Sequence, residues 1–287
     1  RPDRVKLAPD TPRGSDMTGL TVAVQMDPIE RIRIAGDATF ALLLEAQNRG
    51  HRIVYYTPDR LSLAGATAMA SVQDLQVRDI ADDHFTLGEP RLIDLATCDV
   101  VLLRQDPPFD LAYISTTHVL ERIHPQTLVV NDPVSVRNAP EKLFVLDYAR
   151  YMPPTLITRS FEEVDAFRKQ HGEIVIKPLH GNAGSAVMHI GADGKNLAAL
   201  SELFGHVWRE PFMAQAFLRE VAGGDKRIVL VDGVVAGAIN RIPGKGEIRS
   251  NLAAGGRAEP TSLTPDEQAI CDVLAPELKA RGLIFVG

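Results

Sequence analysis

The sequence predicts an α/β fold in which an N-terminal open parallel sheet is followed by a two-part α+β module. In the first half of the chain, apolar runs of strand length alternate with helical or loop segments, which is the pattern of a parallel sheet. In the second half, apolar runs are joined by short Gly-containing turns, which favours antiparallel strands. A chain of 287 residues is too long for one small core, so we expect two or three domains.

Composition and charge exclude several classes of protein. The chain has 31 basic and 37 acidic residues and a formal net charge of −6, so no nucleic-acid partner is expected. No apolar run approaches the roughly 20 residues needed to cross a bilayer, so no membrane partner is expected. Cys98 and Cys271 lie far apart without metal-ligand spacing, which favours a reducing cytoplasm. Residues 1–16 are polar and rich in proline, unlike a signal peptide, and Met17 is the expected natural start.

Four apolar runs predict the parallel sheet between Leu20 and Asp132. We expect Asp37 to cap the helix after the first run rather than to bind a ligand. Ligands of such sheets bind beyond the carboxyl ends of the strands. No GxGxxG motif accompanies these ends, so no nicotinamide or flavin is expected. The runs are Thr21 to Met26, His51 to Tyr56, Cys98 to Leu103 and Thr127 to Val130, with a helix from Thr39 to Asn48.

Arg104 follows directly on the third of these runs. A guanidinium at a strand end is well placed to bind a carboxylate through two hydrogen bonds. An ion pair with Asp106 or Asp110 explains the residue equally well.

The segment from Glu173 to Ile190 reads as strand, Gly-rich turn, strand. Its first strand carries a lone cation, Lys177, which is costly to bury unless an anion meets it. The turn from His180 to Ser185 can present backbone N–H groups to phosphate oxygens. The segment fits a lid that closes over a polyphosphate, and a plain hairpin with a snorkelling lysine fits about equally well.

Two further positions suit a nucleotide. Lys142 follows Pro140 early in a predicted helix, where a cation opposes the helix dipole unless a phosphate lies nearby. Taken alone, a solvated surface lysine is the favoured interpretation of Lys142. Phe212 to Leu218 reads as an apolar strand whose end, Gln215 to Leu218, suits a hinge for a flat nucleobase. Periodicity alone favours a core strand there.

The dipeptide Asp232-Gly233 predicts a tight hairpin turn between two strands. Arg227 and Arg241 would then lie close together, and neighbouring like charges suggest an anion between them. The Gly-rich segment 241–257 that follows is expected to act as a lid or binding loop. A disordered loop is the alternative.

The last segment of the sequence predicts a helix and then a buried strand. The helix begins at Thr264 and ends at Gly282, and the strand starts at Leu283. The chain stops inside this strand, so further residues are expected after Gly287.

Eight short strings together resemble the bacterial glutathione synthetases, a family of ATP-grasp ligases. The resemblance extends from Leu20 to Gly287, and several of the strings are specific to this family. The strings are MDPIERIRI, LLRQDPPFD, NAPEKLF, IVIKPLHGNAG, MAQAFLRE, GDKRIVLVDG, RIPGKGEIRSNLAAGGR and KARGLIFVG.

The resemblance implies an N-terminal, pre-ATP-grasp domain at residues 17–139 on the substrate side. A lid domain at 140–212 and a C-terminal domain at 213–287 would form the ATP-grasp module, with nucleotide held between them. The Gly-Asn-Ala-Gly-Ser turn has fewer consecutive glycines than many relatives, so lid mobility is expected to be somewhat lower.

The resemblance also implies roles for individual residues. Arg227 and Arg241 would act in catalysis, facing the transferring phosphate and the substrate acyl group. Substrate would be bound by Arg104, Arg249, Asn251, Gly255, Gly256 and Arg257. ATP would be bound by Lys142, Lys177, Gly181, Asn182, Gly184, Gln215, Ala216, Phe217, Leu218 and Asp225.

The implied reaction joins γ-glutamylcysteine to glycine while ATP is split to ADP and phosphate. The implied metal is Mg²⁺ or Mn²⁺, whose ligands are expected after Gly287 and not within this chain. A homo-oligomer, commonly a tetramer, and a cytoplasmic location follow from the same resemblance. The alternatives are another ATP-grasp carboxylate–amine ligase, such as a D-alanine–D-alanine ligase, and a nucleotide-binding regulator without catalysis. A sugar or acid kinase fits least, because the phosphate turn joins two strands.

Overall fold

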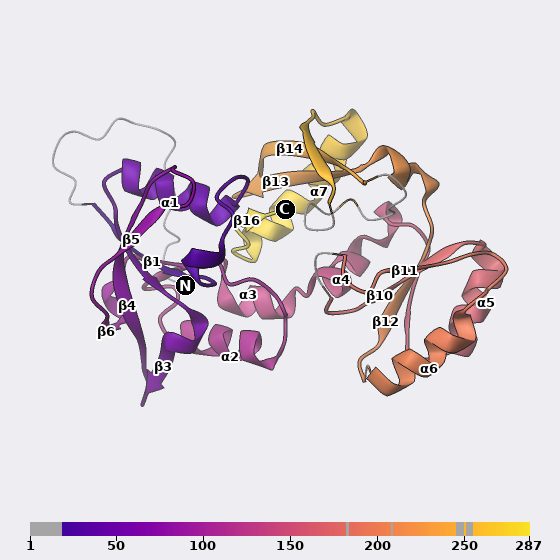
Figure 1. Cartoon of the computed structure of the whole chain (residues 1–287), viewed down its shortest axis with the longest axis horizontal. Helices are drawn as coiled ribbons and strands as arrows, with labels where there is room; N and C mark the ends of the chain where they lie inside the picture. Colours follow the sequence, from indigo (N-terminus) through magenta and orange to yellow (C-terminus); the bar gives the residue numbers. More distant parts are fainter. Residues whose placement is uncertain (1–18, 182–183, 208, 245–249, 251–254) are drawn as a thin grey trace.

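The computed structural model describes residues 19–181, 184–207, 209–244, 250 and 255–287. Figure 1 shows three units that follow one another along the chain, each built on its own sheet. Within these ranges, five short 3-10 helices connect larger elements. They are η1 (Ile29–Arg31), η2 (Pro58–Arg60), η3 (Leu95–Thr97), η4 (Val145–Tyr151) and η5 (Arg219–Gly223).

The N-terminal unit contains the predicted parallel strands. Strands β1 (Thr21–Gln25), β2 (Arg52–Tyr56), β7 (Val100–Leu103) and β8 (Leu128–Val130) pair in the order β2-β1-β7-β8, and every pair is parallel. Helices α1 (Ala38–Asn48), α2 (Leu111–Leu120) and α3 (Pro133–Asn138) connect or follow them. The Asp37 side chain accepts a hydrogen bond from the Phe40 backbone N–H at 2.7 Å, so its predicted role as a helix cap is confirmed.

The sheet contains antiparallel strands besides the four predicted parallel ones. Strands β3 (Leu61–Ala64), β4 (Thr67–Val77), β5 (Phe85–Leu87) and β6 (Arg91–Asp94) add an antiparallel extension, so the sheet is mixed. Strand β4 alternates buried and less buried residues, with Ala68, Ala70 and Val72 in the core. Alanine is small and only weakly hydrophobic, so the alternation of apolar and polar residues along β4 is weak. This explains why the sequence did not reveal the strand.

The middle unit is an antiparallel sheet with the order β11-β10-β12-β9. Its strands are β9 (Thr155–Thr158), β10 (Ile174–Pro178), β11 (Met188–Ile190) and β12 (Phe212–Ala216). Helices α5 (Phe161–His171) and α6 (Leu197–Val207) cover one face, and Val164, Ile174, Ile176, Phe204 and Phe212 pack in the core between them. The expected boundary between residues 212 and 213 falls within β12, which pairs with both β10 and β9.

The C-terminal unit has the order β15-β14-β13-β16. Asp232 and Gly233 both have positive φ, 48° and 78°, as the predicted two-residue hairpin turn requires. Thr264 and Glu267 form a capping box at the start of the last helix. The elements are β13 (Asp225–Val231), β14 (Val234–Ile242), β15 (Arg257–Pro260), α7 (Pro265–Ala280) and β16 (Phe285–Val286), which is shorter than predicted.

None of the described helices combines the length and apolar character needed to span a membrane.

Candidate active site

A cavity of about 500 Å³ lies where the middle sheet faces the hairpin of the C-terminal unit. Its lining comes from α4 (Glu141–Phe144), β10 and its turn, β12, η5 and strands β13 and β14. All the described residues that were expected to bind ATP or to act in catalysis belong to this lining. They are Lys142, Lys177, Gly181, Gly184, Gln215, Ala216, Phe217, Leu218, Asp225, Arg227 and Arg241.

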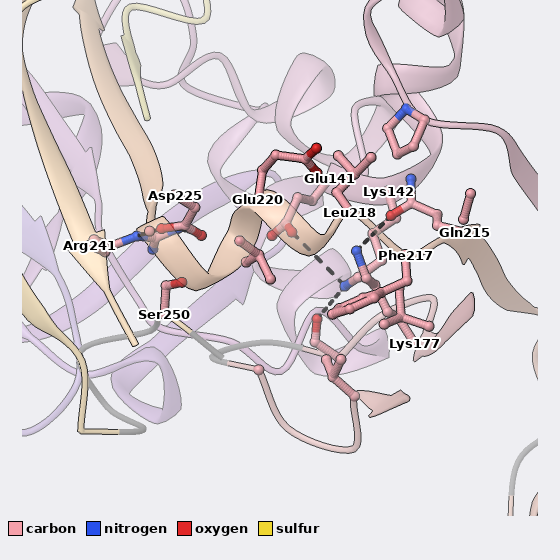
Figure 2. A pocket seen from close by; sticks show the side chains of 18 of the residues that line it. Glu141, Lys142, Lys177, Gln215, Phe217, Leu218, Glu220, Asp225, Arg241 and Ser250 are labelled. Atoms are coloured by element: carbon pink, nitrogen blue, oxygen red, sulfur yellow. Dashed lines mark hydrogen bonds and ion pairs between the residues drawn. The ribbon is translucent and has the colours of Figure 1, made fainter. Parts of the chain in front are cut away.

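The two lysines converge on one side of the cavity from separate segments, as expected. Lys142 Nζ donates a 2.6 Å hydrogen bond to the Gly181 backbone oxygen, and its side chain is only 13% exposed. Lys177 Nζ donates to Gln215 Oε1 at 2.6 Å. Figure 2 shows both side chains with Gln215 at one end of the cavity. The interpretation of Lys142 as a solvated surface lysine was therefore wrong.

Lys177 sits in an environment that disfavours its charge. Burial lowers its pKa, and the neighbouring ammonium of Lys142 lowers it further, while Glu141 opposes both effects. Among the described residues, neither lysine has a carboxylate at hydrogen-bond distance. Lys142 Nζ lies 4.0 Å from Glu141 Oε1. Two adjacent cations held this way favour a multiply charged anion between them.

The described part of the turn between β10 and β11 contacts Lys142. Its N-terminal end is tied to Lys142 through the Gly181 oxygen, and Gly184 has φ of 75°, which favours glycine. Asn182, which was expected to contact ATP, lies outside the described residues. The described part of the turn joins two antiparallel strands, as the sequence predicted.

The predicted nucleobase hinge follows β12 directly. Gln215 is buried and bridges two strands, because its Nε2 donates to Thr155 Oγ1 at 2.9 Å while its Oε1 accepts from Lys177. The backbone N–H of Phe217 donates to the Glu173 oxygen, which fixes the path of the hinge. Phe217 and Leu218 line the cavity beside them and supply apolar surface.

Arginines occupy the opposite end of the cavity. Arg241 Nε and Nη2 donate to the two carboxylate oxygens of Asp225, each at 2.7 Å, and Asp225 and Arg241 are direct partners in the β13–β14 register. This bidentate pair fixes the position of the Arg241 guanidinium. Arg227 lies two residues along the same strand, and burial together with the Arg241 charge lowers its pKa. The predicted proximity of the two arginines is confirmed, with Asp225 neutralising one of them.

Three polar residues line the cavity that the sequence did not indicate. Glu141 and Glu220 place carboxylates near the lysines and the hinge. Ser250 is 3% exposed, and its buried Oγ has no hydrogen-bond partner among the described residues. Figure 2 shows Ser250 beside Asp225 and Arg241. No sequence pattern marks these residues, because each reaches the cavity only through the way in which separate segments of the chain meet.

Of the residues expected to bind substrate, the four that the structure describes, Arg104, Gly255, Gly256 and Arg257, are not part of this lining. Arg104 Nε donates to Thr39 Oγ1 at 2.9 Å, and its guanidinium lies 5.1 Å from the centre of the Phe285 ring. Among the described residues, Arg104 forms no ion pair with Asp106 or Asp110, which was the alternative interpretation. Burial lowers the pKa of Arg104, and the nearby charges of Asp37 and Asp106 partly offset this effect.

The other expected substrate residues lie around the segment that follows β14. Arg257 begins β15 and pairs with Glu259 on the surface, after a turn that contains Gly255 and Gly256. Arg249 and Asn251 lie outside the described residues.

Comparison with known proteins decides the family. Residues 20–137 match the N-terminal domain of prokaryotic glutathione synthetase, and residues 141–287 match its ATP-grasp domain. The chain belongs to the prokaryotic glutathione synthetase family. It is 61% identical to the glutathione synthetase of Rhodopseudomonas palustris and 42% identical to that of Shewanella oneidensis. Each alignment covers 93% of this chain and 86% of the relative.

Solved structures share the ATP-grasp fold at low identity. A D-cycloserine synthetase matches 92% of this chain and 83% of its own length, with a TM-score of 0.62 and 16% identity. A RimK domain ATP-grasp protein from Sphaerobacter thermophilus matches with a TM-score of 0.58 and 20% identity, over 92% of this chain and 83% of its own length. These likenesses show the fold alone, whereas the membership of the glutathione synthetase family comes from the sequence.

The described residues do not form a metal centre by themselves. Among them, no group of three or more His, Cys, Asp or Glu side chains is placed to hold an ion. We therefore assign no metal position and derive no reaction step through a metal.

Proposed function

We propose that this chain joins γ-glutamylcysteine to glycine with the cleavage of ATP to ADP and phosphate. The observation that carries the proposal is the convergence of Lys142, Lys177 and the Arg227–Arg241 pair on one cavity, in a chain of this family. The predicted nucleobase hinge lies near the lysines in this cavity of about 500 Å³, and the arginines line its other end.

The chemistry needs an activated carboxylate, because an oxide leaving group is poor. The cysteinyl carboxylate of γ-glutamylcysteine attacks the γ-phosphorus of ATP, and the bond to the ADP oxygen breaks. The glycine amine then attacks the acyl carbon, loses a proton and expels inorganic phosphate. Charge stabilisation and positioning carry most of such a reaction, so no side-chain nucleophile is required.

Each end of the cavity has a distinct role in this scheme. Lys142 and Lys177 bind phosphate oxygens of ATP, and the Gly181–Gly184 turn covers them. Gln215 to Leu218 receive the adenine. Arg227 and Arg241 stabilise negative charge on the transferring phosphoryl group and on the acyl oxygen, and Asp225 holds Arg241 in place.

The dipeptide is assigned to Arg104 of the N-terminal unit, and glycine to the loop between β14 and β15 of the C-terminal unit. Arg104 binds a carboxylate of the dipeptide, and Gly255, Gly256 and Arg257 belong to the loop that encloses the acceptor. We assign Arg249 and Asn251 to substrate binding in the same loop. Exclusion of water matters here, because an acyl phosphate hydrolyses when wet.

Four finer features rest on the family resemblance. Mg²⁺ or Mn²⁺ would supply charge neutralisation of the ATP phosphates. A homo-oligomer and a cytoplasmic location are proposed on the same basis. The division into units at 17–139, 140–212 and 213–287 also remains a proposal.

Coupled ADP release with each substrate omitted in turn tests the function. The proposal predicts turnover only when ATP, a divalent metal, γ-glutamylcysteine and glycine are all present. Glutathione should appear in equal amount with ADP. Equal ADP release without γ-glutamylcysteine, or with D-alanine in place of both substrates, would reject the proposed substrates.

A further inference from the structure

The Asn131 side chain binds the last strand of the chain through two hydrogen bonds. Its Nδ2 donates to the Phe285 backbone oxygen at 2.9 Å, and its Oδ1 accepts from the Phe285 backbone N–H at 2.8 Å. The two residues are 154 positions apart in the sequence. Asn131 follows β8 of the N-terminal sheet, so its amide acts as an extra strand partner for β16 of the C-terminal sheet.

The strand held in this way lies between two cations of the proposed reaction. On one side, the Phe285 ring faces the Arg104 guanidinium at 5.1 Å from ring centre to Cζ. On the other side, β16 pairs with β13, the strand that carries Arg227. A Cβ atom built on Gly287 would lie 3.8 Å from Arg227 Nη1. A displacement of β16 would therefore change the surroundings of both guanidinium groups.

Neighbouring contacts place the clamp at a fixed point of the N-terminal unit. The backbone N–H of Asp132 donates to the Gly282 oxygen at 3.1 Å, just before the last strand. The Asp132 carboxylate caps α3 through the Ser135 N–H and lies 3.1 Å from His124 Nε2. Asn131 thus adjoins a residue that is held by several contacts, while Phe285 begins a two-residue strand.

We propose that Asn131 is a positioning residue for the ligation reaction. By clamping Phe285, it fixes the distance between Arg104, proposed to bind the dipeptide, and Arg227, proposed to stabilise the transferring phosphoryl group. This inference rests on the proposed function, because it assigns Asn131 a role in aligning the dipeptide with ATP. It does not place Asn131 in contact with either substrate.

The chain offers a matched control for the same type of clamp. Gln47 Nε2 donates to the Val77 backbone oxygen at 2.7 Å, and Gln47 Oε1 accepts from the Val77 N–H at 2.8 Å. Both amides are partly buried, and Gln47 lies at the far end of α1 from Thr39, the Arg104 partner. Asn131→Ala and Gln47→Ala therefore each remove one two-bond clamp, and only the first touches β16.

The test compares steady-state kinetics of the two variants and of the unchanged protein. For Asn131→Ala we expect kcat/KM for γ-glutamylcysteine to fall about 10- to 100-fold, as for other small misplacements of reacting groups. The KM for ATP should stay within about 2-fold, since the lysines and the hinge lie on other elements. Gln47→Ala should lower thermal stability to a similar extent while leaving both kinetic parameters within about 2-fold.

A second variant and a second measurement keep the test decisive. Asn131→Asp keeps the acceptor for the Phe285 N–H but sets a carboxylate oxygen against the Phe285 carbonyl, so it should show the same selective loss. Amide hydrogen exchange of residues 283–286 should be faster in both Asn131 variants and unchanged in Gln47→Ala. This measurement needs no turnover, so it separates failure of the clamp from failure of the proposed reaction.

Two results would overturn the inference. Equal kinetic losses in Asn131→Ala and Gln47→Ala would make Asn131 a general stability contact. Faster exchange at 283–286 with unchanged kcat/KM for the dipeptide would show that the clamp exists but does not align the reaction.

Discussion

Replacing Lys177 by methionine tests whether this lysine serves to bind a ligand or to stabilise the fold. Methionine keeps the length and apolar stem of lysine and removes its charge. In the free protein Lys177 is partly buried, its pKa is lowered by burial and by Lys142, and its one hydrogen bond in the described residues goes to Gln215. A group in this position contributes little to stability, whereas it should contribute strongly to the binding of an anion.

The expected magnitudes follow from these contacts. Loss of a charge-assisted hydrogen bond to a phosphate oxygen costs about 1.5–3 kcal/mol, which corresponds to about a 10- to 150-fold rise in the Kd for ATP. For the free protein, loss of the Gln215 bond is offset by relief of desolvation and of the repulsion from Lys142. We therefore expect the free energy of unfolding of Lys177→Met to stay within about 1 kcal/mol of the unchanged protein.

Lys226→Met is the matched control. Lys226 Nζ donates to Glu267 Oε2 at 2.6 Å and to the Ser262 oxygen at 2.9 Å, so it ties β13 to the start of α7 outside the cavity. This variant should lose about 1 kcal/mol of stability and keep its ATP affinity. Isothermal titration with a non-hydrolysable ATP analogue and urea unfolding measure the two quantities. A destabilised Lys177→Met that binds the analogue normally would refute the reasoning.

Four further predictions follow from the same cavity and from its scaffold. Asp225→Asn should lower kcat about 10-fold or more with the KM for ATP within about 2-fold, because Arg241 loses its bidentate partner; a changed KM alone would contradict this. ATP affinity should fall as pH rises through the lowered pKa of Lys177, with proton uptake on binding that is measurable by titration in buffers of different ionisation enthalpy. The unfolded chain keeps this proton up to about pH 10.5, so Lys177 makes the stability of the free protein rise with pH between the two pKa values. Thr264→Ala should lower the free energy of unfolding by about 1 kcal/mol through loss of the capping box, with unchanged turnover at 25 °C.

The sequence was most informative where local chemistry decides the structure. The Asp37 cap, the Asp232-Gly233 turn and the start of the last helix at Thr264 each depend on residues within four positions of one another, and all three are present. Lys177 stood out because a cation interrupts an apolar strand, which local reasoning can detect.

Features that depend on how distant segments meet could not be predicted in this way. The Asp225–Arg241 pair requires the register of β13 and β14, so the sequence suggested two neighbouring arginines but not the carboxylate that holds one of them. Arg104 was placed correctly at a strand end. Its contacts with Thr39 and Phe285, however, come from residues that lie 65 and 181 positions away in the sequence. Antiparallel strand β4 was missed for a local reason, because its alanines make the alternation of apolar and polar residues too weak to detect.

The central claim is that Lys142 and Lys177 bind the phosphates of one ATP molecule in this cavity. A crystal structure with a non-hydrolysable ATP analogue tests it most directly. We expect both Nζ atoms within about 3.2 Å of phosphate oxygens, with the Gly181 turn over them and the adenine beside Leu218. An analogue bound elsewhere, or phosphates that neither lysine reaches, would contradict the account.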